Sequence, residues 1–231
     1  FFNNHTRELR LHLELDESLA YVLGWFLGDG NAACTDHNPN RFTLSLGMDK
    51  AEMYMRALTR ALQHSLGVRL ISERHRTHIH LHFHSLTFKL LLTRLGLLGK
   101  RAHEKFIPDE LFNVTPTVQQ AFLRGLIQSD GYITVGRTGR SPSPVVGYCT
   151  VSRRLADGLV MLYRQLGYLP RTTRRRCATH TSSGIRFVSR HDRHDILLST
   201  KEQLLRMRDV WAAHKDAPRL RTWLACIPSR P

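Results

Sequence analysis

Two segments of this 231-residue chain end in the same way, and they constrain the fold more than any other feature of the sequence. Residues 22–30 read Val-Leu-Gly-Trp-Phe-Leu-Gly-Asp-Gly, and residues 123–131 read Leu-Arg-Gly-Leu-Ile-Gln-Ser-Asp-Gly. The two aspartates, Asp29 and Asp130, are 101 residues apart. In each segment two small residues lie four positions apart, on one helical face, where they let two helices approach closely. The repeat predicts an internally duplicated chain whose halves meet through these helices.

A carboxylate at the end of each helix predicts a paired acidic site. Asp29 and Asp130 would repel each other, and each would lie at the negative end of a helix dipole. Divalent cations such as Mg²⁺ relieve this conflict, because they bind carboxylate oxygens, main-chain carbonyls and water. Two carboxylates that hold metal ions are a recurring device for attack on phosphodiesters. The alternative, that each Asp-Gly only ends a helix, explains two matched occurrences less well.

The aspartates belong to a longer repeat, since each half has the periodicity helix-strand-strand-helix-strand-strand-helix. In the first half we predict helices at residues 16–30, 49–66 and 85–95 and strands at 41–46, 68–75 and 77–84. In the second half we predict helices at 115–130, 152–166, 192–198 and 201–214, strands at 132–137, 145–151, 171–178 and 185–190, and an irregular tail at 216–231. Gly30 is expected to stop the first helix in a left-handed conformation. The boundary separates an N-terminal subdomain, residues 1–112, from a C-terminal subdomain, residues 113–231.

The charge is large and unevenly placed. The formal net charge is +15. Residues 1–115 carry 14 basic and 12 acidic side chains, a net charge of +2, whereas residues 116–231 carry 20 and 7, a net charge of +13. Such an excess favours a polyanionic partner, because phosphate neutralisation releases counterions. Of the 34 basic residues, 28 are arginines. Arginine forms bidentate hydrogen bonds with phosphates and with the edges of guanine bases. A solvated basic surface is the simpler alternative, and an anionic membrane surface is less favoured.

Cysteine usage and the lack of targeting segments bear on the compartment. The four cysteines are widely scattered and form no Cys-x-x-Cys pair, which is typical of free thiols in a reducing compartment. No apolar run approaches the roughly 18 residues that a membrane span needs, and the N-terminus lacks the layout of a signal peptide. We therefore expect a protein of the cytoplasm or an organellar matrix that acts at the genomic DNA and is not secreted.

The two Asp-Gly segments resemble the paired motifs of the LAGLIDADG homing endonucleases. The final Asp-Gly, the central glycine and the small residue before the aspartate match in both. The sixth motif position, often acidic in that family, is Leu27 and Gln128 here. Residues 105–108, Lys-Phe-Ile-Pro, and residues 151–167 are similar to blocks of intein-type members. The resemblance implies an α+β fold in which an αββαββα module is duplicated in one chain and two saddle-shaped antiparallel sheets lie on DNA.

The resemblance also implies a metal site. Asp29 and Asp130 are implied as catalytic metal ligands, helped by the main-chain carbonyls of Gly28 and Ser129. Mg²⁺ is the expected cofactor, with Mn²⁺ able to substitute and Ca²⁺ supporting binding without efficient cleavage.

The family further places a basic residue near each active centre, where it stabilises phosphate charge or polarises a water molecule. By the block resemblance Lys105 is the candidate for the first centre, 76 residues after Asp29. Lys201, 71 residues after Asp130, is its positional counterpart, and Arg206, at the 76-residue offset, is a rival. An exposed, solvated side chain is the alternative for each lysine.

Strand patterns predict the DNA-binding surface. Residues 77–84, Thr-His-Ile-His-Leu-His-Phe-His, alternate so that the histidines share one face and the apolar residues the other. A shared metal ion is disfavoured, because residues two apart on a strand are separated by about 6–7 Å in rise. A polar face toward nucleic acid is favoured over a simply solvated one, since a two-stranded ribbon fits the major groove. The expected DNA contacts are Asn38, Asn40, Arg41, Thr43, Ser45, Arg76, His78, His80, His82, His84, Arg137, Arg140, Arg174, Arg175, Arg176, Arg186 and Arg190.

These features lead to one functional prediction with two alternatives. The favoured function is a metal-dependent homing endonuclease that makes a staggered double-strand break, with short 3′ overhangs, in a long asymmetric DNA target. The chain would act as a monomer whose two halves correspond to the two subunits of a dimer, that is, as a pseudo-dimer. An RNA-splicing maturase of the same fold is the first alternative. A catalytically silent DNA-binding regulator is the second, and the presence of both Asp29 and Asp130 argues against it.

Overall fold

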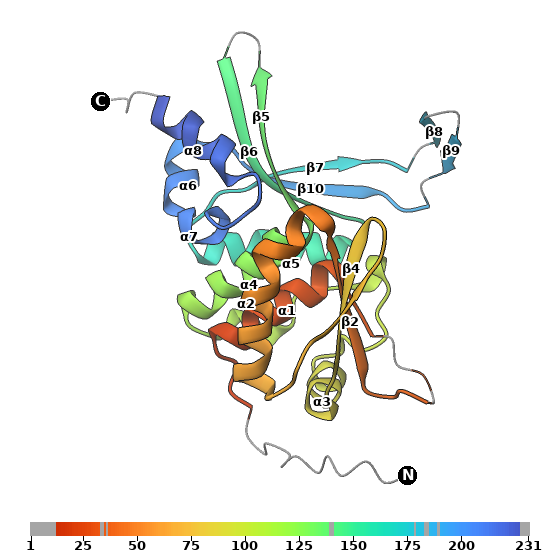
Figure 1. Ribbon diagram of the computed structural model, residues 1–231. Coiled ribbons are helices and arrows are strands. Elements are labelled where there is room, and N and C mark those ends of the chain that lie inside the picture. Colours follow the sequence, from red (N-terminus) through yellow and green to blue (C-terminus); the bar gives the residue numbers. More distant parts are fainter. Residues whose placement is uncertain are drawn as a thin grey trace.

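The computed structural model describes residues 13–32, 35, 37–138, 141–177, 179–182, 185–188 and 190–226. It confirms a mixed fold of helices and antiparallel sheets in which one arrangement occurs twice (Figure 1). The longer helices are α1 (Glu17–Asp29), α2 (Met48–Leu66), α3 (Leu86–Arg94), α4 (Pro116–Asp130), α5 (Arg153–Gln165) and α8 (Ala217–Cys226). Shorter ones are α6 (Lys201–Arg206), α7 (Arg208–Trp211) and the 3-10 helices η1 (Ala102–Glu104) and η2 (Asp109–Phe112).

Two four-stranded antiparallel sheets accompany the helices. The strands of the first sheet, in spatial order, are β1 (Gly30–Asn31), β2 (Arg41–Gly47), β4 (His78–His84) and β3 (Ile71–Arg74). Those of the second are β5 (Gly131–Thr138), β6 (Ser141–Thr150), β10 (Arg193–Leu198) and β7 (Arg171–Arg175). A separate two-stranded ribbon joins β8 (Thr179–Ser182) to β9 (Ile185–Val188). In both large sheets the strand that follows a motif helix pairs with its successor in the chain, so the halves share one topology.

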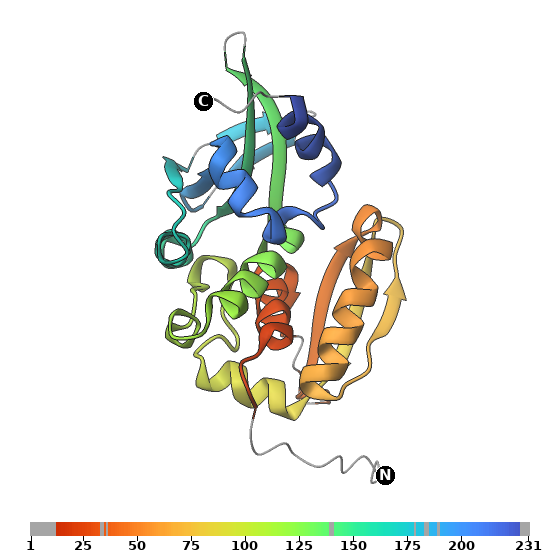
Figure 2. The ribbon, with the colours of Figure 1, turned by 90° about the vertical axis from the view of Figure 1, so that its left-hand side faces the viewer.

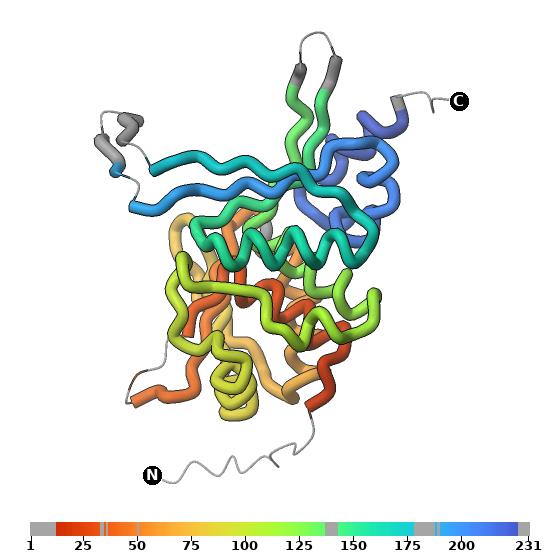
Figure 3. Tube along the Cα trace, turned by 180° about the vertical axis from the view of Figure 1, so that it is seen from behind, coloured from red at the N-terminus to blue at the C-terminus, as the bar shows by residue number. Residues whose placement is uncertain are grey.

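Helices pack against both sheets, and α4 and α8 contact β5 of the second sheet. Helices α1 and α2 pack on the first sheet and α5 packs on β6 and β10 of the second. Figure 2 shows α2 lying along the first sheet, and Figure 3 shows the β5–β6 and β7–β10 ribbons reaching beyond the helices. The apolar residues of β2 and β4 are fully or nearly fully buried. We refer to the face opposite the apolar side chains of each sheet as its open face.

The core is one continuous cluster that draws on both halves. In the first half Phe42, Phe83 and Phe88 form a compact aromatic group, with ring centroids 5.0–5.4 Å apart. In the second half Ile133, Tyr148 and Leu159 belong to the same cluster. The division into subdomains of residues 1–112 and 113–231 stays a prediction. None of the helices within the described ranges has both the length and the apolar character that crossing a membrane requires.

Two predicted elements near the C-terminus are wrong. Residues 193–198 form strand β10 in the middle of the second sheet, not a helix. Ile196 and Leu198 alternate toward the core while β6 and β7 pair on either side, so long-range pairing overrides the local pattern. Residues 217–226 form α8, where an irregular tail was expected, and Ala217 and Leu220 bury its apolar side.

Helices α1 and α4 lie side by side at the centre of the molecule (Figures 1 and 2). A Cβ placed on Gly24 would overlap the carbonyl oxygen of Phe122, and one on Gly125 would overlap that of Tyr21. The two contacts are related by the same 101-residue shift as the sequence motifs. The small residues therefore serve the close helix approach that the sequence predicts.

We expect Gly24→Ala to lower the free energy of unfolding by about 1–3 kcal/mol, toward the upper end because the obstructing atoms belong to the backbone. Urea denaturation followed by circular dichroism measures this change. Gly136→Ala is the matched control, since its Cβ would come no nearer than 3.8 Å to the atoms around it, and it should stay within about 0.5 kcal/mol of the parent. Equal stability of both variants would contradict the helix contact.

Candidate active site at the paired helix ends

Helices α1 and α4 end together, and this brings their aspartates to one place. A Cβ on Gly28 would overlap the Ser129 hydroxyl and lie 3.3 Å from the Cβ of Asp130. Ser129 is fully buried and turns its hydroxyl back to the Leu126 carbonyl, at 2.9 Å. Asp29 directly follows Gly28, so both carboxylates extend from the same end of the helix pair. Both are at least partly accessible to solvent.

The glycine after each aspartate ends its helix by close packing and not by a left-handed turn. Gly30 has φ −90° and ψ 147°, so the expected left-handed conformation is wrong. A Cβ on Gly30 would strike Phe26, and one on Gly131 would strike Ile127, again a 101-residue correspondence. The chain thus passes straight from each helix into the first strand of its sheet, with the aspartate at the junction.

Lys105 reaches the same point from the segment between the halves. Its Nζ donates to the carbonyl oxygens of Leu27, at 2.7 Å, and Gly28, at 3.1 Å. Burial lowers the pKa of Lys105, and attraction to Asp130 and Asp29 opposes that change. One ammonium therefore lies within electrostatic reach of both carboxylates. It also uses the Gly28 carbonyl, which the family resemblance implies as a metal ligand.

The second half holds Lys105 in place. The Ser152 hydroxyl donates to the Lys105 carbonyl at 2.5 Å and accepts from the Leu155 N–H at 3.2 Å, where it caps α5. Ser152 is completely buried. The sequence assigns Lys105 to the active centre by the family resemblance alone. For Ser152 the sequence predicts no more than a helix cap, and not its contact with Lys105.

Two buried side chains near Asp130 were not predicted. Tyr148, opposite Gly131 in the sheet, has a pKa raised well above its usual value, first by burial and then by Asp130 and Asp29. The ring of His214 has two polar neighbours: Nε2 is 3.3 Å from the Gly131 carbonyl oxygen, and Nδ1 is 3.1 Å from the main-chain nitrogen of Asp216. Since Nδ1 accepts from that N–H, Nε2 carries the proton and donates to Gly131.

The candidates for a second basic residue lie at the two ends of α6. Lys201 is the first residue of this helix, directly after its N-cap Thr200. Arg206 is the last, and its guanidinium lies 6.0 Å from the ring centroid of Tyr168, beside Gly167. A role at the Asp130 centre stays a prediction for either.

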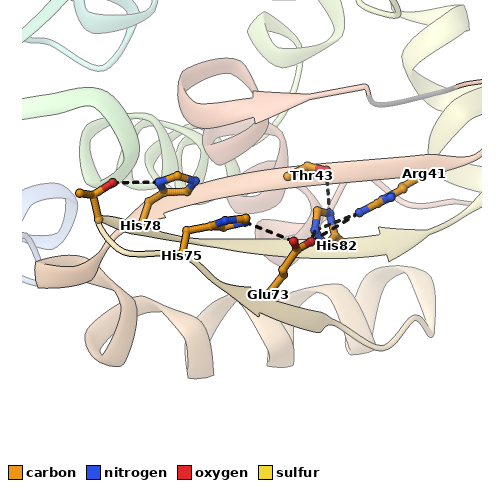
Figure 4. A network of polar contacts seen from close by, with 7 residues as sticks. Arg41, Thr43, Glu73, His75, His78 and His82 are labelled. Atoms are coloured by element: carbon orange, nitrogen blue, oxygen red, sulfur yellow. Dashed lines mark hydrogen bonds and ion pairs between the residues drawn. The ribbon is translucent and has the colours of Figure 1, made fainter.

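The open face of the first sheet carries the predicted polar row. Strand pairing sets Thr43 beside His82 and Ser45 beside His80, as the alternation predicts. His82, however, is 6% exposed, and its ring accepts from the Thr43 hydroxyl at 2.8 Å and donates to Glu73 at 2.9 Å (Figure 4). That hydrogen bond lowers the pKa of Glu73. Arg41 lies 3.9 Å from the same carboxylate, so part of this row is already committed within the sheet.

The remaining candidates of the first half surround this row. Asn38 and Asn40 precede β2, and Asn38 donates its N–H to the Thr35 hydroxyl at 3.1 Å. Arg76 is exposed in the turn before β4, and His84 is exposed at the end of β4. His78 and His80 are partly exposed between these ends.

The open face of the second sheet is built around a buried carboxylate. Asp195, 2% exposed, lies 2.8 Å from Arg193 and 3.3 Å from Arg175. Strand register places Arg171 on the same face as Arg175. Arg171 and Arg193 were not among the predicted DNA contacts, and only the β7–β10 register identifies their face.

The other predicted arginines differ in position. Arg174 points to the opposite face from Arg175 and pairs with Asp192, with Nε 2.7 Å from its carboxylate. Arg176 and Arg190 are exposed beyond the strand ends. Arg140 and the side chains of Arg137 and Arg186 lie outside the described part of the chain.

Comparison with known proteins bears on this arrangement. Residues 117–211 match the family model of the LAGLIDADG-like domain. The homing endonuclease I-DmoI, in a structure with DNA and Mn, has the same fold, with a TM-score of 0.55 and 12% identity over 87% of this chain and 99% of that one. The second half of the chain therefore matches a LAGLIDADG-like domain, and the chain as a whole has the fold of these LAGLIDADG proteins. WhiA from Thermatoga maritima shares this LAGLIDADG fold as well, with a TM-score of 0.53 and 13% identity over 94% of this chain and 63% of that one.

The curated relatives match in shorter segments. The replicative DNA helicase DnaB of Nostoc sp. is 43% identical over 77 residues, which is 33% of this chain and 8% of the helicase. The homothallic switching endonuclease of Saccharomyces cerevisiae is 38% identical over 73 residues, 31% of this chain and 12% of that protein. The chain thus spans only a small part of the length of these relatives.

We expect Lys105→Met to lower the free energy of unfolding by about 1.5–3 kcal/mol, because it removes two hydrogen bonds from a charged donor. It also leaves two carboxylates without their shared ammonium. Thermal and urea denaturation should be measured in EDTA, so that no cation replaces the amine. Lys100→Met, an exposed lysine of the same segment, is the control, and it should change stability by at most about 0.5 kcal/mol. Equal effects of the two changes would contradict the bridging position of Lys105.

Proposed function

We propose that this chain is a metal-dependent, site-specific endonuclease that makes a staggered double-strand break in a long asymmetric DNA target. The main support is the position of Asp29 and Asp130 at the shared end of α1 and α4, with the Lys105 ammonium within electrostatic reach of both. Subdomains 1–112 and 113–231 would each supply one carboxylate and one sheet. A single chain would therefore act as a monomer with two pseudo-symmetric halves.

The residues at the helix ends fit a divalent cation. Two carboxylates lie at the negative ends of two helix dipoles, and the Lys105 ammonium supplies only one compensating charge. Asp29 and Asp130 would hold Mg²⁺ or Mn²⁺, which are bound through hard oxygen ligands. When bound, such ions stabilise charge on a phosphodiester and favour deprotonation of a water molecule. Structures of I-DmoI with DNA and Mn, Ca or Mg agree with this class of cofactor.

Lys105 and His214 act on the helix ends in this proposal. The Lys105 ammonium holds the last carbonyls of α1, so it positions Asp29 and offers positive charge near both carboxylates. His214 holds the Gly131 carbonyl just beyond Asp130 with a neutral ring. The two halves thus support their aspartates with different chemistry.

The open faces of the two sheets are the proposed DNA surface. Both faces are polar. Each belongs to a sheet whose first strand begins directly after a motif aspartate. In the described part of the chain, helices α1 and α2 pack on the other face of the first sheet. The two faces differ strongly, with imidazoles on one and arginines around Asp195 on the other. Different faces would read different half-sites, which favours an asymmetric target.

The curated relatives support an intein-type origin. A replicative helicase and a switching endonuclease each match fewer than 80 residues of this chain, and the match makes up a small part of each relative. A short module that occurs in proteins as different as a helicase and an endonuclease is typical of an element inserted into unrelated genes. We propose that this chain descends from such an element.

We expect Asp29→Asn and Asp130→Asn each to abolish double-strand cleavage in Mg²⁺ while largely preserving DNA affinity, because the amide keeps the shape of the side chain but loses its charge. Incubation with a plasmid library of targets, followed by sequencing of the cut ends, identifies the site. Cleavage and gel-shift assays then compare the variants, and Ca²⁺ should support binding without efficient cutting. Asp157→Asn, an exposed helix residue paired with Arg153, is the control and should cut normally. Normal cutting by either motif variant would refute the assignment, and binding of the parent without cutting would indicate a regulator.

The arginines of the open face should dominate nonspecific attraction. We expect Arg171→Gln to flatten the slope of log affinity against log salt by about 0.9, the value for one phosphate contact on B-DNA. Arg164→Gln, an exposed change at the end of α5 on the covered side of the sheet, should leave the slope unchanged. Fluorescence anisotropy over a range of salt concentrations measures both slopes. The reverse order of effects would show that DNA meets the helical side.

A further inference from the structure

Three imidazoles gather on the open face of the first sheet. His78 lies on β4, and His75 lies in the turn that joins β3 to β4 (Figure 4). His80 also lies on β4. Their ring centroids are 4.5–4.7 Å apart in all three pairs, and one ligand nitrogen from each lies within 4.8 Å of the other two. We call these three residues the His triad.

The backbone explains why the third imidazole belongs to the group. The His75 N–H donates to the His78 carbonyl at 2.9 Å, which closes the turn. The strand alternation then turns His78 and His80 to one face. The sequence predicts that histidines two residues apart on a strand lie too far apart to share a metal ion. The rings of His78 and His80 nevertheless lie close together, because the two side chains lean toward each other. His75, at the end of the neighbouring strand, contacts both rings.

The His triad also has an unsatisfied nitrogen. His75 Nε2 is shielded from solvent and has no hydrogen-bond partner among the described residues. The nearest carboxylate oxygen, from Glu73, lies 3.4 Å away, and its other oxygen is bound to His82. A buried nitrogen of this kind costs free energy unless it binds something. Three rings packed against one another would also repel if they were protonated.

From this geometry we propose that the His triad binds one transition-metal cation of the zinc class. Neutral imidazole nitrogens suit Zn²⁺, Co²⁺, Ni²⁺ and Cu²⁺. A tetrahedral Zn²⁺ with bonds of about 2.0–2.1 Å separates its ligands by about 3.4 Å. The rings would therefore close together by little more than an ångström, which partly exposed side chains on a hairpin reach by small rotations. In this arrangement His75 binds the cation through Nδ1, so that Nε2 carries the proton and faces the Glu73 carboxylate, 3.4 Å away, a common support for a ligand imidazole.

The site is distinct from the paired aspartates in its ligand chemistry. The helix ends offer carboxylate and carbonyl oxygens, which suit Mg²⁺, whereas the His triad offers nitrogens, which Mg²⁺ binds poorly. The proposal therefore does not depend on nuclease activity. A cation bound by the His triad links the turn at His75 to the strand at His80 and rigidifies one edge of the open face.

The test titrates the EDTA-treated full-length protein with Co²⁺ and then Zn²⁺ in excess Mg²⁺, following visible absorption of Co²⁺ and the heat of Zn²⁺ binding. We expect a tetrahedral Co²⁺ spectrum that Zn²⁺ abolishes. His75→Asn and His78→Asn should each weaken the tightest site at least tenfold. His84→Asn, an exposed histidine at the end of the same strand, is the matched control and should bind as the parent does. A thermal melt shows whether each variant is folded, and the two triad variants alter different backbone elements.

Three results would overturn the proposal. The first is absence of saturable binding at micromolar metal in the parent. The second is unchanged affinity in folded His75→Asn and His78→Asn variants. The third is loss of the Co²⁺ site in Asp29→Asn together with retention in the triad variants, which would assign the ion to the helix ends.

Discussion

The contact between α1 and α4 is the constraint on which the rest of the structure depends. Gly24 and Gly125 each lie against a main-chain carbonyl of the other helix, and any side chain there would separate the pair. Because the helices touch along their length, they also end together, and the residues at their ends have no freedom to move apart. The position of Asp29 relative to Asp130 is thus set by backbone packing in the core and not by surface loops.

This packing brings two negative charges together at one end of the helix pair. Two carboxylates at two helix C-termini concentrate negative charge, and Lys105 is the basic side chain that lies buried against them. Ser152, from the second half, holds the Lys105 backbone. The positive charge of Lys105 is therefore tied to both halves of the chain.

Much of this arrangement follows from sequence, and the exceptions have a common cause. The duplicated helices, the Asp-Gly ends and the alternation at 78–84 depend on local periodicity, which a sequence displays directly. Strand β10 and helix α8 depend on distant partners, and Gly30 depends on its distance to Phe26, so local patterns misjudge all three. Tertiary contacts likewise bring His214 to the Gly131 carbonyl and, separately, bring the three rings of the His triad together. No spacing rule in the sequence predicts that His75 contacts His80.

The halves keep their symmetry where packing requires it and lose it elsewhere. The glycine contacts, the helix ends and the first strand pairing repeat at a shift of 101 residues. The open faces obey no such restraint, because polar side chains on an uncovered sheet contact solvent or a ligand and not each other's counterparts. One face has become rich in imidazole and the other holds Asp195 among arginines. A symmetric core that carries two different faces can retain one paired site while each half adapts independently to its own stretch of a partner.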